Sequence, residues 1–562
     1  MKLKLWFCAA ALVPAALLGA CLSSFFIPML IGTPWRFDLG SWWLYWQHLD
    51  SARVAPYVSD IKWGTSLGFG VPFASWCGMA VLGFRPHKQS THGDARFASA
   101  AEIAKQGFFE SSENAIVIGK HRGKILRLAG QQFVMLAAPT RSGKGVGVVI
   151  PNLLEYGESV VVLDIKQENH ALTSGWRAAQ GQSVFLFNPF AEDLRTHRWN
   201  PLSYVSPDPR FRVSDIQNIA AMLYPDGADE QAFWVSQSRN AFQALVLYLF
   251  DNFNDERDMG LPETSLNFPT LGHVNRLAAG NGSDLKGFLR ELSERSFCGT
   301  ETRLAFSGLL SQADDTFASI VGSLRAPLSA WVNPVLDAAT SGNDFWLTDL
   351  RKQKMSIYIG IQPNKIAEAR LLINLFFSQL INVNTRQLPS QDSTLVNSCL
   401  LMMDEFTSIG KVEVIAHAVS YIAGYNLRLM PIIQSVAQLE ATYGKETART
   451  LMTNHALQIV FAPREQQDAN AYSEMLGYKT LRKTNRSRSS GANGAVTRAE
   501  VEERRALMLP QELKSLGKDK EIILYEGLAQ PILCEKIRYF EDPYFKQRLL
   551  PPAPVPELIL RA

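Results

Sequence analysis

The cysteines and histidines of this 562-residue sequence follow no metal-binding or disulfide pattern. Its six cysteines form no Cys-x-x-Cys pair and no close set, which argues against a zinc site and against a disulfide framework. The nine histidines form no His-Glu-x-x-His metal site. Net charge is only +3, so the charge balance neither requires nor excludes a nucleic-acid partner. The length allows two or three domains, each with its own core.

Two long uncharged runs stand near the N-terminus. Leu5–Ile31 would span about 40 Å as a helix, enough to cross a bilayer, and Trp63–Phe84 is a second run of spanning length. The connection between them, residues 32–62, carries balanced charge. Basic residues flank the pair on its outer ends: Lys2, Lys4, Arg85, His87 and Lys88. The positive-inside rule therefore predicts a membrane anchor over residues 1–88, with both termini in the cytoplasm and the loop outside.

Two alternatives to this anchor remain open. The first run is also compatible with a cleaved signal peptide, because Leu17–Cys21 resembles a lipoprotein cleavage site. A signal peptide would, however, leave the second uncharged run without an explanation. The second run, with its five glycines, is also compatible with a buried core helix. Its small residues at four-residue spacing, such as Gly64 and Gly68, permit close helix packing.

The stretch "LAAPTRSGKGVGVVIPNLL" resembles a phosphate-binding P-loop, or Walker A motif. A strand candidate, Gln132–Leu136, precedes it, and the following residues would form the helix, although Pro151 and the glycines lower their helix propensity. The first glycine of the motif is replaced by Ala138, and the closing Ser/Thr, whose hydroxyl ligates Mg²⁺, is replaced by Gly145. The predicted nucleotide-binding residues are Ala138, Pro139, Thr140, Arg141, Ser142, Gly143, Lys144, Gly145 and Val146.

Adjacent acids follow a buried strand candidate much later in the chain. Asn397–Phe406 is apolar and contains Asp404 and Glu405, which is the Walker B arrangement. In that arrangement the first acid holds the Mg²⁺ shell, through water in this case, and the second orients or deprotonates water. The sequence therefore predicts ATP and Mg²⁺ as cofactors. Lys144 would bridge the β- and γ-phosphates, and Glu405 would be catalytic.

A third strand candidate ends in a polar amide. Leu427–Ser435 is apolar apart from its last residues, where Gln434 stands. An amide at that place would sense the γ-phosphate or position water, as in RecA-like ATPases. Together with the loop and the acidic pair, Gln434 predicts an ATPase. Two further runs, Ser159–Asp164 and Ser183–Pro189, have the β-branched, apolar character of buried parallel strands.

Several segments, in this order, resemble the TraG-like type IV secretion coupling proteins of the conjugative DNA-transfer family. The matching segments cover the chain from about residue 90 onward. In this branch of the family a Gly-Lys-Gly ending of the loop is common, which implies that the loop is a working variant. The segments are His92–Ala98, "APTRSGKGVG", Val161–Asn169, Arg198–Leu202, "MMDEFTSIG", Ile422–Leu439 and Lys536–Arg548.

The resemblance implies an α/β fold: a RecA-like P-loop nucleotide-binding domain with an inserted, mostly helical domain, preceded by two transmembrane helices. The nucleotide-binding domain would comprise residues 89–204 and 326–550, and the inserted all-alpha domain residues 205–325. The interval before the strand candidate Lys354–Pro363 holds helix-like patterns that suit this insertion. Residues 551–562 form a proline-rich tail, whose composition favours an untethered end, with a docking peptide as the alternative.

The resemblance also implies partners and a location. Such proteins are inner-membrane hexamers that pass a relaxase–single-stranded DNA complex, effector proteins, or both to the type IV secretion channel. Ring ATPases of this kind use an arginine from the neighbouring subunit. At the position where several relatives carry that arginine, this chain has Ala423. Arg428, Arg239 and Arg325 are therefore the candidates for this role, and the sequence does not choose among them.

Two rival functions share part of this evidence. An FtsK-like double-stranded DNA translocase has the same motor, but no winged-helix candidate follows residue 510. A nucleotide-binding docking scaffold without turnover would not require Glu405. The basic segment Lys479–Arg498 contains six Lys or Arg residues and no Asp or Glu. It suits a solvated linker, and alternatively a loop that meets nucleic-acid phosphates or a membrane surface.

Overall fold

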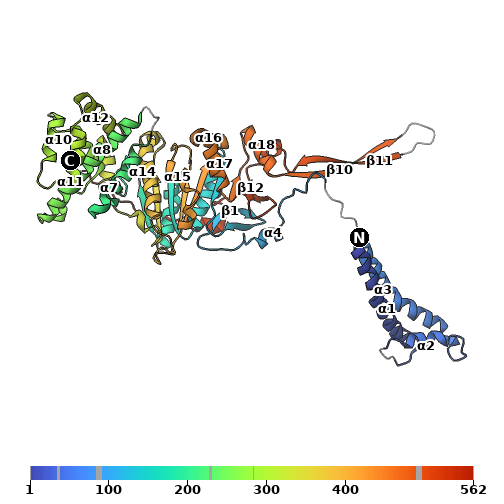
Figure 1. Ribbon diagram of the computed structural model, residues 1–562. Helices are drawn as coiled ribbons and strands as arrows, with labels where there is room; N and C mark the ends of the chain where they lie inside the picture. Colours follow the sequence, from blue (N-terminus) through green and yellow to red (C-terminus); the bar gives the residue numbers. More distant parts are fainter. Residues whose placement is uncertain are drawn as a thin grey trace. The chain divides into compact units, whose positions relative to one another are not determined.

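The computed structural model describes residues 2–34, 38–83, 91–226, 231–282, 284–488 and 496–560. The chain divides into a helical unit over Met1–Thr91 and a larger unit over His92–Ala562 (Figure 1). The helical unit is a pair of long helices joined by shorter ones. Its elements are α1 (Lys2–Ile31), α2 (Ser41–Gln47), η1 (Ala55–Tyr57) and α3 (Val58–Gly83).

Small residues let α1 and α3 pack closely. A methyl group on Gly68 would lie 2.4 Å from the backbone nitrogen of Ser23, and one on Gly64 would lie 2.9 Å from that of Ile27. Neither position therefore has room for a larger residue. The four-residue spacing noted in the sequence is used within the chain, between its own two helices.

The predicted spans differ in how apolar they are. Within α1, Ala9–Ile31 is long and apolar enough to cross a membrane, whereas α3 is not among the stretches of the described chain that meet that measure. The other stretch that does, Pro363–Asn384, is 56% buried. It comprises η8 (Pro363–Lys365) and α14 (Ile366–Asn384), a core helix of the larger unit. Phe84, Arg85, His87 and Lys88 lie outside the described residues.

A single mixed sheet of 11 strands organises the described part of the larger unit. Seven strands, from β9 to the edge strand β5, run parallel, and β12, β13, β1 and β2 continue the sheet antiparallel beyond β9. In sheet order the strands are β2 (Lys124–Leu128), β1 (Ile116–His121), β13 (Ile532–Glu535), β12 (Lys520–Tyr525), β9 (Leu457–Val460), β3 (Val134–Ala137), β8 (Leu427–Ile433), β7 (Cys399–Met403), β4 (Ser159–Asp164), β6 (Met355–Gly360) and β5 (Ser183–Phe187).

The middle strands are covered on both faces, which explains their continuous apolar runs. Every residue of β3, β4, β6, β7 and β8 is buried. All the strands predicted from the sequence in this region are present, within three residues of their predicted ends. The flanking helical elements are α4 (Ala100–Lys105), η2 (Gly145–Val149), α5 (Ile150–Glu155), α6 (Glu168–Ala179), α15 (Glu413–Ala418), η9 (Ile422–Tyr425), α16 (Val436–Tyr443), α17 (Lys445–Thr453), α18 (Gln466–Met475), α19 (Pro510–Lys514) and α20 (Pro543–Lys546).

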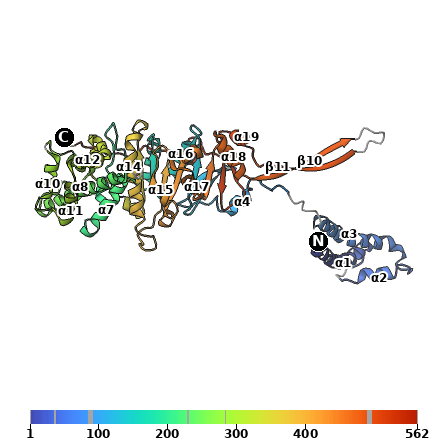
Figure 2. The ribbon, with the colours of Figure 1, turned by 45° about the horizontal axis from the view of Figure 1, so that its top comes forward.

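The regular elements in the described part of the connection between β5 and β6 are helices. Its long helices gather at one end of the larger unit in both views (Figures 1 and 2). Helix α12 runs through residue 325, so the helices continue past the boundary expected for the inserted domain. The elements are η3 (Pro201–Tyr204), α7 (Pro209–Leu223), α8 (Ala232–Asp258), η5 (Glu263–Ser265), α9 (Leu271–Ala279), α10 (Leu285–Ser293), α11 (Thr300–Leu310), α12 (Asp314–Leu328), η6 (Ser329–Val332), α13 (Pro334–Ala339) and η7 (Leu347–Asp349).

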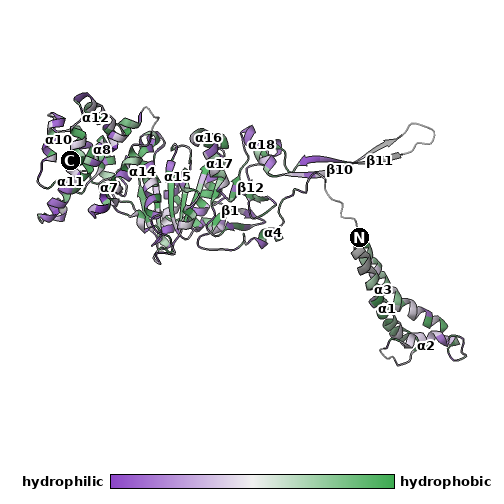
Figure 3. Ribbon diagram, viewed as in Figure 1, coloured by the Kyte–Doolittle hydropathy of each residue, from purple (hydrophilic) through white to green (hydrophobic). Residues whose placement is uncertain are grey.

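The basic segment forms a ribbon rather than the linker favoured by its composition. Strands β10 (Tyr478–Arg488) and β11 (Val496–Ala506) pair antiparallel over eleven positions, and β10 is drawn as hydrophilic in Figure 3. Ion pairs Arg482–Glu502 and Lys483–Glu503 cross the ribbon. Arginine and lysine of the segment thus find carboxylates on the returning strand, which composition alone does not reveal. The ribbon's tip, residues 489–495, lies outside the described residues.

The proline-rich tail is docked, contrary to the expectation of an untethered end. The amide of Ala553 donates to Ser174 Oγ at 3.0 Å, and the amide of Leu558 donates to the carbonyl of Leu194 at 2.7 Å. The Leu558 side chain is buried in the main core. Extended, proline-rich chain lies flat on a surface at little entropic cost, so a few backbone bonds and one buried side chain hold it.

Gly175 on α6 supplies the space for this tail, because a methyl group there would lie 1.9 Å from the carbonyl oxygen of Pro551. We expect Gly175→Ala to lift the tail and to raise hydrogen exchange at Ala553 and Leu558 at least about ten-fold, as local opening predicts. Gly308→Ala is the matched control, since that helical glycine has nothing within 4 Å. Unchanged exchange in the tail of Gly175→Ala would contradict this account.

Candidate functional site

The glycine-lysine loop lies where β3 ends, between two parallel neighbours. The amide of Ala138 donates to the carbonyl of Ile433 on β8 at 2.9 Å, which continues the sheet pairing into the loop. Arg141 and Gly143 both have positive φ, at 59° and 86°. For Gly143 this left-handed conformation costs little, and it turns the chain into the helix that follows. The Gly147 amide then donates to the Gly143 carbonyl at 2.8 Å and begins that helix.

A wide, π-helical turn allows the residues after the loop to form a helix despite their poor helix propensity. Residues of η2 form a π-helical turn, in which the amide of Ile150 donates to the carbonyl of Gly145, five residues earlier. Pro151 has no amide hydrogen and would clash with a carbonyl in an α-helical turn, and a π-turn relieves that clash. The helix is kept by burial of its apolar residues, which include Val148, Val149 and Leu153.

Lys144 contacts both acids of the predicted Walker B strand. Its Nζ lies 2.8 Å from Asp404 Oδ1 and 2.5 Å from Glu405 Oε1. The two acids follow β7 directly, and Glu405 has a left-handed φ of 57°, which turns its side chain back over the strand end. The structure thus brings together three residues that the sequence analysis selected separately.

Gln434 completes the cluster from the strand between loop and acids. It follows β8, which lies between β3 and β7. Its Nε2 donates to Glu405 Oε2 at 2.6 Å, and its Oε1 accepts a hydrogen bond from Thr140 Oγ1 at 2.9 Å. The amide therefore links the loop to the acid. Because Gln434 is hydrogen-bonded to both Thr140 and Glu405, a movement of one can be transmitted to the other.

Burial disfavours the charged form of Glu405, but hydrogen bonding and charge from Lys144, with the Gln434 amide, outweigh it and hold the pKa of Glu405 below its ordinary value. The carboxylate is therefore ionised at neutral pH. It has the protonation state that a base acting on water requires.

Asp164 is a member of the cluster that the sequence analysis did not select. It ends β4, beside β7, and accepts a hydrogen bond from the His170 amide at 2.8 Å. Burial, with the nearby charge of Asp404 adding to it, raises the pKa of Asp164 to about 7. An acid at the end of a buried strand, as in "VVVLD", was the available signal. Asp164 thus brings a further carboxyl group near Asp404, but the described residues contain no set of three such side chains placed to bind one metal ion.

The residues around the loop fit a nucleotide and Mg²⁺. A methyl group on Gly145 would meet nothing within 4 Å, so there is open space where the usual hydroxyl would stand. Lys144 offers an ammonium beside the loop amides, and Asp404 and Glu405 offer carboxylate oxygens, the donors that Mg²⁺ prefers. The loop amides and the Lys144 ammonium suit phosphate groups, and the carboxylates suit the metal ion.

Arg428 is not placed to reach a neighbouring subunit. Its side chain is fully buried, and it donates to the carbonyls of Gln132, Asn114 and Leu128. Arg239 donates to the carbonyl of Tyr224 and pairs with Asp226. Arg325 is exposed on α12. Of the three alternatives raised by the sequence, burial therefore removes Arg428.

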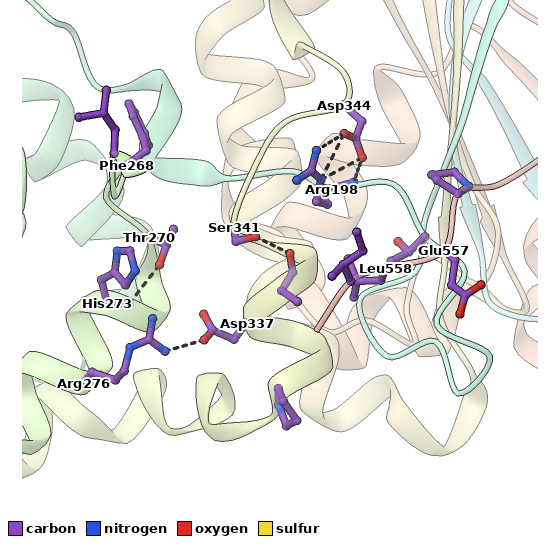
Figure 4. A pocket seen from close by; sticks show the side chains of 16 residues that line it. Arg198, Phe268, Thr270, His273, Arg276, Asp337, Ser341, Asp344, Glu557 and Leu558 are labelled. Carbon is purple, nitrogen blue, oxygen red and sulfur yellow. Dashed lines mark hydrogen bonds and ion pairs between the residues drawn. The ribbon is translucent and has the colours of Figure 1, made fainter. Parts of the chain in front are cut away.

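A cavity of about 760 Å³ lies away from the loop. It is lined by the tail, by α9 and α13, and by the segment around Arg198 (Figure 4). Its arginines are paired within the chain: Arg198 with Asp344 at 2.8 Å and Arg276 with Asp337 at 2.6 Å. None of its lining residues belongs to the cluster around Lys144.

Comparison with known proteins decides the family. The model of the type IV secretory system conjugative DNA transfer family matches residues 89–560. The chain belongs to this family. It is 29% identical over 522 residues to the protein VirD4 of Rhizobium radiobacter, which covers 91% of this chain and 72% of that protein. It is 28% identical over 560 residues to the conjugal transfer protein TraG of Escherichia coli, covering 90% and 86%.

Solved structures confirm the predicted RecA-like α/β fold of this family member. The plasmid coupling protein TrwB in complex with the ATP analogue ADPNP superposes with a TM-score of 0.56 at 18% identity, covering 81% of this chain and 95% of that one. TrwB in complex with ADP and Mg²⁺ gives a TM-score of 0.54 at 18% identity, covering 81% and 96%. Family and fold, which the sequence analysis expected, are thus established.

Because the buried Arg428 side chain donates to three main-chain carbonyl groups, we expect Arg428→Met to lower the free energy of unfolding by about 3 kcal/mol or more. Thermal unfolding of the purified chain in detergent measures this as a drop of several degrees in Tm. The exposed Arg325→Met is the matched control and should change the Tm little. An Arg428→Met chain as stable as the parent would show that these hydrogen bonds are not needed.

Proposed function

We propose that this coupling-protein family member hydrolyses ATP and uses the energy to pass its substrate to a type IV secretion channel. The observation that supports this most is the contact of Lys144 with both Asp404 and Glu405, with Gln434 bonded to the same acid. A loop that only bound phosphate would need neither a positioned acid nor an amide linked to it. The arrangement is the one that water activation beside a γ-phosphate requires.

Each side chain has one task in this proposal. Lys144 leaves the carboxylates and neutralises the β- and γ-phosphates, which requires it to exchange one set of anions for another. Glu405, ionised and released from Lys144, accepts a proton from the attacking water. Gln434 orients that water and relays the state of the γ-phosphate to Thr140. Asp404 would hold Mg²⁺ through the metal's hydration shell, and Asp164 lies near Asp404.

Mg²⁺, when bound, supplies charge neutralisation at the phosphate oxygens. In this chain its shell depends on the carboxylates and on water, because Gly145 has no hydroxyl. The loop amides and the Lys144 ammonium supply the remaining positive potential.

Assembly and location extend the proposal. The family relationship supports a homo-hexamer at the inner membrane, working with channel components, and a relaxase–single-stranded DNA complex, effector proteins, or both as cargo. Helix α1, with its apolar Ala9–Ile31, supports anchoring in the membrane. We place both termini in the cytoplasm, on the basis of the flanking basic residues in the sequence.

We expect Lys144→Ala and Glu405→Gln each to lower ATP turnover at least about 100-fold in the purified full-length chain, since each removes a group that would act on the phosphates or on the attacking water. They should differ in binding: Glu405→Gln retains ATP, whereas Lys144→Ala weakens it. Phosphate release and nucleotide binding measure the two effects. Lys365→Ala and Glu413→Gln, at exposed ion pairs, are the matched controls.

Normal turnover in either variant would sink this assignment. Nucleotide binding by the parent chain without phosphate release, under conditions in which the ring assembles, would instead favour a docking scaffold. Stimulation by double-stranded but not single-stranded DNA would favour an FtsK-like translocase.

Gly145→Ser tests the departure from the usual motif. The substitution places a hydroxyl in open space at a residue without positive φ, so we expect normal folding. The Mg²⁺ concentration that gives half-maximal turnover should fall several-fold, because a hydroxyl ligand replaces water. Nucleotide affinity in the presence of EDTA should not change. An unaltered Mg²⁺ requirement would show that the metal lies too far from residue 145.

A further inference from the structure

A second lysine reaches the phosphate-binding loop from the far end of the chain. Lys536 directly follows β13, and its Nζ donates a hydrogen bond to the main-chain carbonyl of Ser142 at 3.1 Å. The same ammonium lies 3.4 Å from the centre of the Phe461 ring, which follows β9. The side chain is thus fixed between an aromatic face and the tip of the loop.

Two acids lie near this lysine. Glu521 on β12 is fully buried and Asp519 is exposed, and the ionised form of each favours the ammonium form of Lys536. Gly119 makes room for the Glu521 carboxylate, since a methyl group there would lie 2.3 Å from Glu521 Oε1. The Lys536 amide also donates to the Asp519 carbonyl at 2.8 Å, and Arg538 pairs with the Asp519 carboxylate.

The contact falls on the peptide that the loop has to orient. A phosphate-binding loop directs its amide hydrogens at the phosphates, and the carbonyl of the same peptide plane then points the opposite way. The Ser142 carbonyl belongs to the peptide that joins Ser142 to Gly143. A donor on that carbonyl therefore fixes the direction of the Gly143 amide before any ligand arrives.

We propose that Lys536 is a positioning residue of the phosphate-binding loop, which holds the Ser142–Gly143 peptide with its amide turned toward the phosphates of a nucleotide. This inference rests on the proposed nucleotide-binding function. Lys536 acts through Ser142, and its charge adds to the positive potential that the loop offers to phosphate.

Protonation of Lys536 gives the proposal a distinctive signature. Burial, partly offset by the charges of Glu521 and Asp519, lowers the pKa of Lys536 to about 8. Burial also raises the pKa of Glu521 to about 8, and Cys534 on β13 contacts that carboxyl group. A bound phosphate would favour the ammonium form. Nucleotide affinity should therefore be greatest below pH 8 and fall as pH rises through that value.

The test is binding of a fluorescent ADP analogue to the full-length chain in detergent, at pH 7 and pH 9. Lys536→Met keeps the length of the side chain and removes its donor and charge, and we expect the Kd at pH 7 to rise about ten-fold. The affinity of the parent chain should fall between pH 7 and pH 9, and that of Lys536→Met should not. Lys518→Met, at an exposed lysine just before β12, is the matched control.

Lys536→Arg separates positioning from a merely structural role. It keeps a donor that stays charged at both pH values, so binding should stay near that of the parent at pH 7 and become insensitive to pH. This variant also decides the case if Lys536→Met fails to fold. Equal affinity of parent and Lys536→Met at pH 7, or an unchanged pH profile in Lys536→Arg, would overturn this inference and leave the proposed function standing. A parent chain that binds no nucleotide at either pH would overturn the proposed function and this inference with it.

Discussion

The ammonium of Lys144 between Asp404 and Glu405 is the interaction on which the rest of the site depends. A partly buried cation needs anions close by, and partly buried carboxylates need a cation. Strand order provides both, because β8 separates the loop strand β3 from the acid strand β7 by one position and carries Gln434 across the gap. Each charge in the cluster is therefore stable only while the others are present. Phosphates that arrive at the loop compete for Lys144 and disturb the whole cluster at once.

The same edge of the sheet is supported from behind by the C-terminal part of the chain. β12 and β13 extend the sheet antiparallel beyond β9, and the residue after β13 contacts the loop itself. Further on, Arg548 pairs with Glu155 at the end of α5, and the tail continues over α6. The last part of the sequence thus packs on the helix that the loop opens. Distance along the chain is no guide to distance from the site.

The helical segment between β5 and β6 illustrates why this fold accepts insertions. Two neighbouring parallel strands need a crossover connection, which passes outside the sheet. Lengthening a crossover costs little entropy, and it leaves the strand register unchanged. The register of β5 with β6 runs without interruption from Ser183 to Phe187, although the long helices α8 and α12 stand between the two strands in sequence. The sheet and the helices can therefore vary separately.

The sequence by itself determined the strands, the loop, the acidic pair and Gln434, because burial on both faces and turn chemistry leave their mark within a few neighbouring residues. The order of its motifs also indicated the family. Only the tertiary structure decided which side chains meet: Lys144 with Glu405 across 261 residues, and Lys536 with Ser142 across 394. The position of Asp164 beside Asp404, the burial of Arg428, the docked tail and the paired basic ribbon were likewise decided by the tertiary structure. Those outcomes depend on strand order and on space left by glycines such as Gly119 and Gly175, and local composition encodes neither.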